Sequence, residues 1–325
     1  MLPLLPRDIL PPPTKSWVDK IKSMRLARRF WIYQKERFPF FGHGLLIGSF
    51  SFCAISYSRL VSGFDTFISP WLFLLCLTNT IGIFFILRIY DEHKDAEDDK
   101  KYRTELPVPR GLISLRELRR IGISTFAILL LLNAIFEPLV LLPLTLVFIW
   151  MWLMGKEFFV RKWLLKRQFW YVVSHMLIIP FVDIFASSFD WYLNGRSAPS
   201  GLLFFFALSF INGLVLEVGR KLKSPDQEKE GVKTYSVLLG GRKGATLWIC
   251  CLFVTFLIGM TSCWYANFPL VCYALLIFGF LISTFFGLRY IFLMSTRSAK
   301  TLEVVSGLWS ILLYLTVGAV PLMTI

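Results

Sequence analysis

Long apolar blocks separated by short charged segments run through the chain from about residue 41 onward. Each block holds roughly 18 or more residues, enough for a helix to cross a hydrocarbon core about 30 Å thick. Backbone groups have no water to bond inside a bilayer, so blocks of this kind must be helical. The pattern predicts an all-α, polytopic membrane protein with nine spans, at residues 41–61, 70–89, 120–136, 138–155, 170–188, 200–217, 245–265, 268–290 and 302–324.

The basic residues alternate with these blocks and fix the expected topology. All 35 lysines and arginines except Arg59 and Arg196 fall in the N-terminal segment or after the second, fourth, sixth and eighth spans. Because cytoplasmic segments carry the excess of lysine and arginine, this pattern supports nine spans. It predicts a cytoplasmic N-terminus and a C-terminus on the opposite side. The apolar blocks begin too late for a secretory signal peptide, so none is expected.

Composition agrees with a membrane protein. Of 325 residues, 56% are hydrophobic and 17% are charged, whereas soluble domains carry about a quarter charged residues. The net charge of +14 would suggest nucleic acid for a soluble protein. Here the basic residues lie between spans, so topology and anionic lipid explain them, and no nucleic-acid partner is expected. The six cysteines lack a metal-type spacing and are interpreted as small buried residues.

An acidic cluster begins where the second span ends, in what we call the first charged loop (residues 90–119). Its carboxylates form two sets with helical spacing, Glu92, Asp95 and Asp99, and Asp91, Asp95 and Asp98. Carboxylates crowded on one helix face repel one another unless a cation lies among them. Oxygen ligands of this kind suit Mg²⁺, which bridges to substrate phosphate. A solvated charge cluster is the alternative, but the membrane-surface position and the basic, proline-rich turn that follows favour a metal site.

At these residues the chain resembles the UbiA superfamily of intramembrane prenyltransferases. The family pattern is N-D-x-x-D-x-x-x-D, followed later by N-R-P-L-x-x-G. This chain has Asp91-Glu92-x-x-Asp95-x-x-x-Asp99, then Glu105-Leu106-Pro107-Val108-Pro109-Arg110-Gly111. The carboxylate spacing matches throughout. Asp91 replaces the family's Asn, and Glu105-Leu106 replaces its Asn-Arg. The nine predicted spans agree with that family.

The resemblance implies nine helices surrounding a cavity that opens to a cytoplasmic polar cap. Residues 1–40 would form a cytoplasmic N-terminal segment, and residues 41–325 the prenyltransferase domain. The implied cofactor is Mg²⁺, and the implied partners are an isoprenyl diphosphate, membrane lipid and a hydrophobic acceptor. Arg103 and Arg110 would bind diphosphate, and the metal ligands in this loop would be Asp91, Glu92, Asp95 and Asp99.

The second charged loop (residues 218–244) follows the sixth span. The family carries an acidic D-x-x-x-D motif here, then often K-x-G-x-K-[S/T], which Lys229-Glu230-Gly231-Val232-Lys233-Thr234 fits. Glu217 occupies the first acidic place, but Lys221 stands four residues later. Asp226 and Glu230 have the four-residue spacing later in the loop, after what resembles an insertion. Either Glu217 or Asp226 is expected to bind a second metal. The cations expected to neutralise phosphate oxygens are Arg220, Lys221 and Lys233. A basic topology signal is the alternative.

Three further residues are catalytic candidates. Asp183 lies inside the fifth span, where a carboxylate is costly and therefore a functional candidate by default. A structural hydrogen bond to a neighbouring helix is the alternative. Lys156 ends the fourth span, where it either faces the cytoplasmic cavity or forms an ordinary salt-bridged helix end. Tyr235 lies in the second charged loop.

Three functions are compatible with these features. The first is a Mg²⁺-dependent prenyltransferase that transfers a prenyl group to an aromatic or lipid-like acceptor. The second is a membrane terpene cyclase, which uses the same diphosphate without an acceptor. The third is a transporter or lipid-binding protein without chemistry, for which the acidic loop would be dispensable. We expect the first, in a bacterial inner membrane, with an organellar membrane as the alternative.

Overall fold

The computed structural model describes residues 23–324. Residues 1–22, more than half of the expected N-terminal segment, and Ile325 lie outside this part. Every regular element in the described part is helical, and nine of its helical segments are long and apolar enough to cross a membrane. The predicted all-α polytopic architecture is therefore confirmed.

The nine candidate spans match the predicted blocks closely. They are α3 (Phe40–Val61), α4 (Pro70–Lys94), α6 (Leu115–Phe136), η1 (Pro138–Val140) continued by α7 (Leu141–Gly155), α9 (Gln168–Met176) continued by α10 (Ile178–Ser188), α11 (Leu202–Arg220), α13 (Gly241–Tyr265), α14 (Leu270–Leu293) and α15 (Thr296–Gly318). The shorter helices are α2 (Leu26–Arg37), α5 (Ala96–Tyr102), η2 (Glu157–Phe159), α8 (Arg161–Leu165), η3 (Pro225–Gln227), α12 (Tyr235–Leu239) and α16 (Val320–Thr324).

The third and ninth spans begin five and six residues earlier than predicted, at Leu115 and Thr296. Two further spans differ in continuity or length. The fifth is interrupted at Leu177, between α9 and α10. Pro180 explains the interruption, because its ring has no N–H and clashes with the carbonyl four residues earlier, at Met176. The second span runs on as α4 to Lys94, and α5 resumes after Asp95. The acidic residues consequently lie on an almost continuous helical path.

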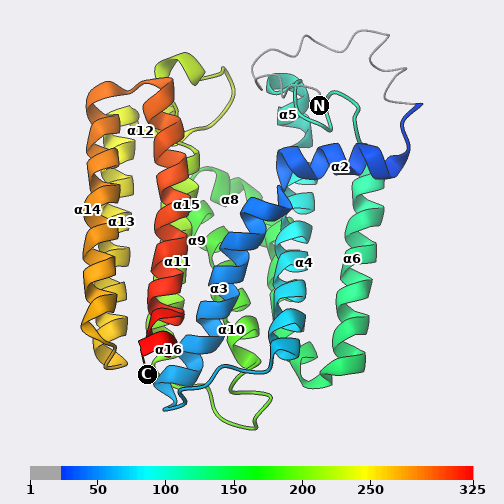
Figure 1. Ribbon diagram of the computed structural model, residues 1–325. Helices are drawn as coiled ribbons and strands as arrows, with labels where there is room; N and C mark the ends of the chain where they lie inside the picture. Colours follow the sequence, from blue (N-terminus) through cyan, green and yellow to red (C-terminus); the bar gives the residue numbers. More distant parts are fainter. Residues whose placement is uncertain (1–22, 325) are drawn as a thin grey trace. The chain divides into compact units, whose positions relative to one another are not determined.

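The chain divides into two compact units, each described here by itself. The first comprises the residues up to Gly44, residues 82–129 and the short segment 229–231. In this unit α2 lies across the ends of α4 and α6 (Figure 1). Phe30 of α2 packs edge-on against Phe85 of α4, with ring centroids 5.9 Å apart. Arg29 of α2 forms a salt bridge of 2.7 Å with Glu117 of α6.

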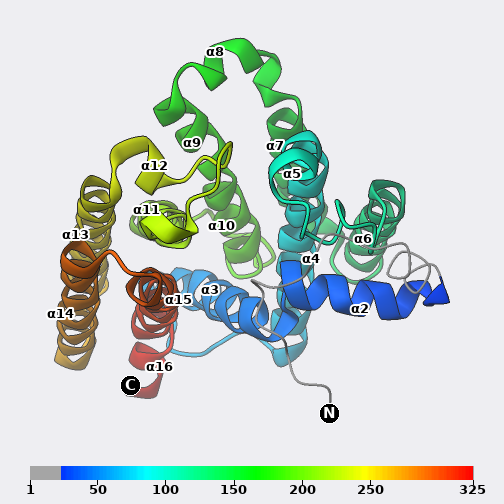
Figure 2. The same ribbon diagram turned by 90° about the horizontal axis from the view of Figure 1, so that it is seen from above.

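The second unit comprises residues 45–81, 130–228 and 232–325. Within it α11 packs against α13 and α15, while α14 packs against α13 and α15 (Figure 2). The indole Nε1 of Trp248 joins three of these helices, because it donates to the Val215 carbonyl at 3.1 Å and to Ser306 Oγ at 3.0 Å. Helix α10 packs against α7 and α11.

The two basic residues that depart from the charge alternation share one acid. Arg59 and Arg196 form salt bridges of 3.1 and 2.6 Å with Asp190, which is completely buried. Ser58 also donates to Asp190, at 2.7 Å. Both guanidinium groups lie over the ring of Phe64, at 5.0 and 4.4 Å from its centroid. Asp190 thus neutralises the positive charge of the two arginines that lie outside the expected alternation.

Candidate active site

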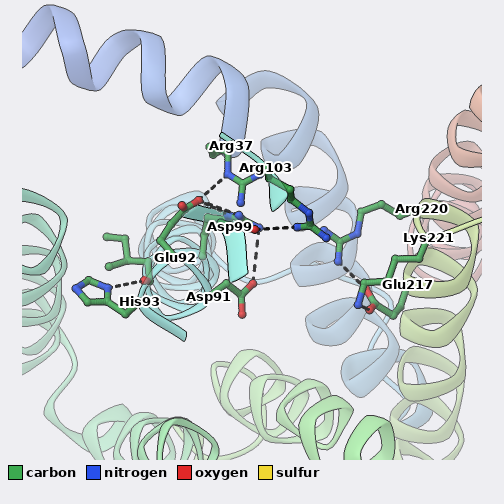
Figure 3. A network of polar contacts seen from close by, with 11 residues as sticks. Arg37, Asp91, Glu92, His93, Asp99, Arg103, Glu217, Arg220 and Lys221 are labelled. Carbon is green, nitrogen blue, oxygen red and sulfur yellow. Dashed lines mark hydrogen bonds and ion pairs between the residues drawn. The ribbon is translucent and has the colours of Figure 1, made fainter. Parts of the chain in front are cut away.

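Glu92 is the most enclosed acid of the first charged loop. It lies in the last turn of α4, with a side chain only 1% exposed. Its Oε1 accepts from Arg37 Nε at 2.6 Å and from Arg88 Nη2 at 2.8 Å (Figure 3). Among the described residues, its Oε2 is buried without a well-formed hydrogen bond, with the Tyr33 hydroxyl as its polar neighbour. A buried carboxylate oxygen in that state is costly, and a cation bound there would remove the cost.

The other acids of the motif lie at different depths. Asp91 is exposed and lies 3.7 Å from Arg88, whereas Asp95 is half-buried. Asp99 is buried and accepts from Arg103 Nη1 at 3.2 Å. Burial raises the pKa of Asp99 to about 6; Arg103 opposes this shift, while the nearby charges of Asp95 and Glu92 add to it. The neighbouring acids thus disfavour a further negative charge at Asp99.

These acids fit Mg²⁺ by chemistry more clearly than by arrangement. Their ligand atoms are carboxylate oxygens, and Glu92 Oε2 has no well-formed hydrogen bond in the described part of the chain. Within residues 23–324, however, no three acidic, histidine or cysteine side chains lie close enough together to hold a metal ion. Three of the four acids are instead paired with arginines: Asp91 with Arg88, Glu92 with Arg37 and Arg88, and Asp99 with Arg103. A bound cation would have to draw the acids together, in competition with Arg37 and Arg103.

The basic, proline-rich turn at residues 103–111 contains two arginines, Arg103 and Arg110, whose surroundings differ. Arg110 is braced, because both terminal nitrogens donate to Glu36 of α2, at 2.9 and 2.7 Å, and Nη1 also donates to the Glu105 carbonyl at 2.8 Å. Only 10% of its side chain is exposed. Arg103 is about one-third exposed, and its guanidinium pairs with Asp99 of the acid cluster. Arg103 is thus better placed than Arg110 to meet a diphosphate.

In the second unit, Glu217 holds two cations at the end of α11. Arg220 Nη2 lies 2.7 Å from its Oε2, and Lys221 Nζ lies 2.5 Å from its Oε1 (Figure 3). The lysine at the family's second acidic place therefore neutralises the acid at the first. Both cations are about half-exposed, so they remain accessible to an anion.

The rest of the second charged loop folds back on itself. The Tyr235 amide donates to the Lys221 carbonyl at 3.1 Å, and the Lys223 amide donates to Ser236 Oγ at 2.9 Å. Thr234 caps α12 by accepting from the Val237 amide. Lys233 and Asp226 are exposed, whereas Tyr235 is buried. Burial and the charge of Glu217 raise the pKa of Tyr235 to about 12.

Asp183 lies well away from this charged end of the second unit. It is completely buried on α10 and accepts a short hydrogen bond from Ser209 of α11. Ser209 precedes Glu217 by eight residues on the same helix, which corresponds to about 12 Å at the helical rise. The other oxygen of Asp183, Oδ1, has no hydrogen-bond partner among the residues that the structure describes. The structure thus provides the interhelical hydrogen bond that was the alternative explanation for this acid.

The side chain of Lys156 is exposed. The next residue, Glu157, makes a close polar contact. Glu157 lies 3.4 Å from His175 Nε2 in the second unit. Glu157, Phe158 and Phe159 have φ angles of 49°, 51° and 60°, a left-handed backbone that non-glycine residues rarely adopt. Sequence spacing could not have revealed this pair, because no local pattern encodes three consecutive left-handed residues.

Comparisons with known proteins agree on one family. The model of the UbiA prenyltransferase family matches residues 49–311. The fold resembles a solved structure described as digeranylgeranylglyceryl phosphate synthase in membranes, with a TM-score of 0.57 and 14% sequence identity, covering 90% of this chain and 99% of that chain. At this identity the likeness concerns the fold. No curated protein matches the sequence.

Proposed function

Because the chain belongs to the UbiA prenyltransferase family, we propose that it is a Mg²⁺-dependent intramembrane prenyltransferase. It breaks the C–O bond of an allylic isoprenyl diphosphate, and the electron pair leaves with the diphosphate. The allylic carbon then bonds to an aromatic or lipid-like acceptor, which gives up a proton. The observation that supports this best is Glu92, a buried carboxylate at the head of the acid run, whose Oε2 has no well-formed hydrogen bond within residues 23–324.

Mg²⁺, when bound, neutralises negative charge on the diphosphate and makes it a better leaving group. Glu92, Asp95 and Asp99 would hold it, with Asp91 at the exposed edge. Arg103 would bind the diphosphate beside these acids. Arg37 and Arg88 hold the Glu92 carboxylate and limit its rotation. A positioned carboxylate needs less reorganisation when the cation arrives.

The second charged loop contributes cations and, through Glu217 or Asp226, a second metal ligand. Arg220 and Lys221 are oriented by Glu217, so their half-exposed charges are ordered before substrate binds. Lys233 adds an exposed charge. Such cations attract the separating diphosphate more strongly than the intact ester, because negative charge accumulates on it as the C–O bond breaks.

A terpene cyclase is the second candidate. It is favoured by the two departures from the family motifs, Glu105-Leu106 in the first charged loop and Lys221 in the second. A cyclase would release a hydrocarbon or terpene alcohol from the diphosphate alone. A prenyltransferase would form its product only when an acceptor is supplied, so the two are distinguished by omitting the acceptor.

The nine apolar spans and the family make this an integral, multi-pass membrane protein. We propose that both charged loops and the N-terminus face the cytoplasm, because they carry the basic residues. A reporter inserted in residues 218–244 should then be cytoplasmic, and one fused to the C-terminus should lie on the other side. Two reporters on the same side would contradict this orientation.

The test of the function uses the purified protein in detergent or lipid. It is incubated with allylic diphosphates of increasing length and with aromatic and lipid-like acceptors, and products are identified by mass spectrometry. Asp95→Asn should abolish turnover while the protein remains folded. Glu97→Gln is the matched control, because Glu97 is an exposed acid two residues away on α5 and should retain activity.

A further inference from the structure

The tip of the second charged loop, residues 229–231, packs against the first charged loop. Both segments belong to the first unit. Lys229 Nζ lies 2.6 Å from Glu105 Oε1. Two residues later, a Cβ atom on Gly231 would collide with ring carbons of Tyr102. The tyrosine ring therefore lies directly against the glycine backbone. We refer to these two contacts, Lys229–Glu105 and Gly231–Tyr102, as the clasp.

Gly231 is required in the clasp for two separate reasons. Its φ angle is 75°, in the left-handed region that side-chain-bearing residues rarely adopt. Its Cβ position is also blocked by the Tyr102 ring. Gly240, in the same loop, shares the first property with a φ of 82° but has no atom within 4 Å of the Cβ position. Comparing alanine substitutions at Gly231 and Gly240 therefore distinguishes the effect of backbone strain from the effect of losing the Tyr102 contact.

Glu105, which accepts the hydrogen bond from Lys229 in the clasp, is itself held in place. Arg110 donates to the backbone carbonyl of Glu105 and is itself bound by both oxygens of Glu36 on α2. Burial alone would raise the pKa of Glu105, but the hydrogen bond from Lys229 lowers it below its usual range. The carboxylate is consequently ionised at neutral pH, and the ion pair with Lys229 is present under working conditions.

We propose that Tyr102, Glu105, Lys229 and Gly231 are positioning residues, which fix the backbone two residues before Lys233 and thereby set where its ammonium meets the diphosphate. This inference rests on the proposed function. Two residues span at most about 7 Å of chain, so anchoring Gly231 confines the Cα atom of Lys233 to a small volume. Charge interactions weaken with distance, so a released tip would leave Lys233 charged but poorly placed.

Hydrogen exchange tests the clasp without any activity measurement. Peptides spanning residues 225–235 are followed by mass spectrometry in Gly231→Ala, Glu105→Gln and wild type. Both variants should exchange faster in this segment, and the combined swap of Glu105→Lys with Lys229→Glu should restore protection. Gly240→Ala and Lys223→Gln should leave it unchanged; Lys223 is a loop lysine that pairs instead with Glu303. Unchanged exchange in both clasp variants would overturn the clasp.

Steady-state kinetics then test positioning. Losing a part-exposed ion pair in Glu105→Gln should lower kcat about two- to fivefold, and Gly231→Ala should lower it about tenfold, the equivalent of 1.4 kcal/mol. Neither variant should lower kcat further in a Lys233→Ala background, because the cation that the clasp positions is already missing. Losses that add fully in that background would overturn the proposal.

Failure of the proposed function and failure of the positioning role give different results. If wild type forms no prenylated product or terpene, the proposed function is wrong, while hydrogen exchange still decides whether the clasp exists. If wild type is active and the clasp variants exchange faster at unchanged kcat, the clasp exists but does not position Lys233. If Gly231→Ala does not fold, Glu105→Gln and the charge swap carry both tests.

Discussion

Arg37 donates from Nε to Oε1 of Glu92 over 2.6 Å, and the two side chains are only 16% and 1% exposed. A carboxylate buried beside the membrane is thus already paired with a cation from α2. Any metal ion at Glu92 must use the remaining oxygen, Oε2, or share the carboxylate with Arg37. The acid cluster and α2 are therefore expected to respond together to Mg²⁺.

Removing that partner should make the protein less stable and more responsive to Mg²⁺. Arg37→Gln leaves the buried carboxylate with Arg88 alone, which we expect to cost about 2 kcal/mol because breaking a buried pair leaves charge uncompensated. Thermal unfolding in chelator measures this loss. Added Mg²⁺ should raise the Tm of the variant more than that of wild type, since less cationic charge competes for Glu92. Arg28→Gln, an exposed change on the same helix, is the control. Equal Mg²⁺ shifts in variant and wild type would show that Arg37 does not compete.

Asp99 should give stability a particular pH dependence. Its pKa is raised to about 6 in the folded protein, against about 4 in an unfolded chain. Between these values the folded state binds more protons than the unfolded state, so the free energy of unfolding falls as pH rises through this window. In chelator, wild type should lose Tm between pH 4.5 and 7 relative to Asp99→Asn. At pH 7, Mg²⁺ should raise the Tm of wild type and have little effect on Asp99→Asn. Parallel pH profiles of the two proteins would argue against the raised pKa.

The cations of the second charged loop should act on kcat more than on KM. Lys233→Ala and Arg220→Ala each remove a charged hydrogen bond to the separating diphosphate. A loss of about 3 kcal/mol corresponds to roughly a hundredfold in rate. If both variants keep near wild-type kcat, the loop is only a topology signal. Comparing Glu217→Gln with Asp226→Asn identifies the metal ligand, because only the ligand's variant should be inactive.

Asp183 should prove structural. It accepts a hydrogen bond from Ser209, which lies about 12 Å along α11 from Glu217. At that distance Asp183 cannot contact a diphosphate bound beside Glu217. Asp183→Asn, which preserves shape, should keep kcat within about threefold. Asp183→Leu should lower Tm, because the hydrogen bond that joins α10 to α11 is then lost. A hundredfold loss of kcat in a stable Asp183→Asn protein would restore the catalytic assignment.

Nine spans were predictable from sequence because apolar length and charge alternation act along the chain. The helical spacing of the first acids was equally local. The interruption at Leu177 has a local cause in Pro180 but was not predicted. Partners from distant segments were not predictable. Nothing in the sequence indicates that Arg37 contacts Glu92, 55 residues away, or that Arg110, assigned to diphosphate, is bound by Glu36. Long-range charge pairing depends on how α2 packs, and several arginines were available for each acid.

The most direct test of the account is product formation by the purified protein with an allylic diphosphate and an acceptor, in Mg²⁺ and in excess chelator. The account predicts a prenylated acceptor and released diphosphate in Mg²⁺, with neither formed in chelator nor by Asp95→Asn. Terpene release without an acceptor would identify the cyclase instead. Full activity in chelator or in Asp95→Asn, or no product from any diphosphate in the panel, would contradict a Mg²⁺-dependent prenyltransferase.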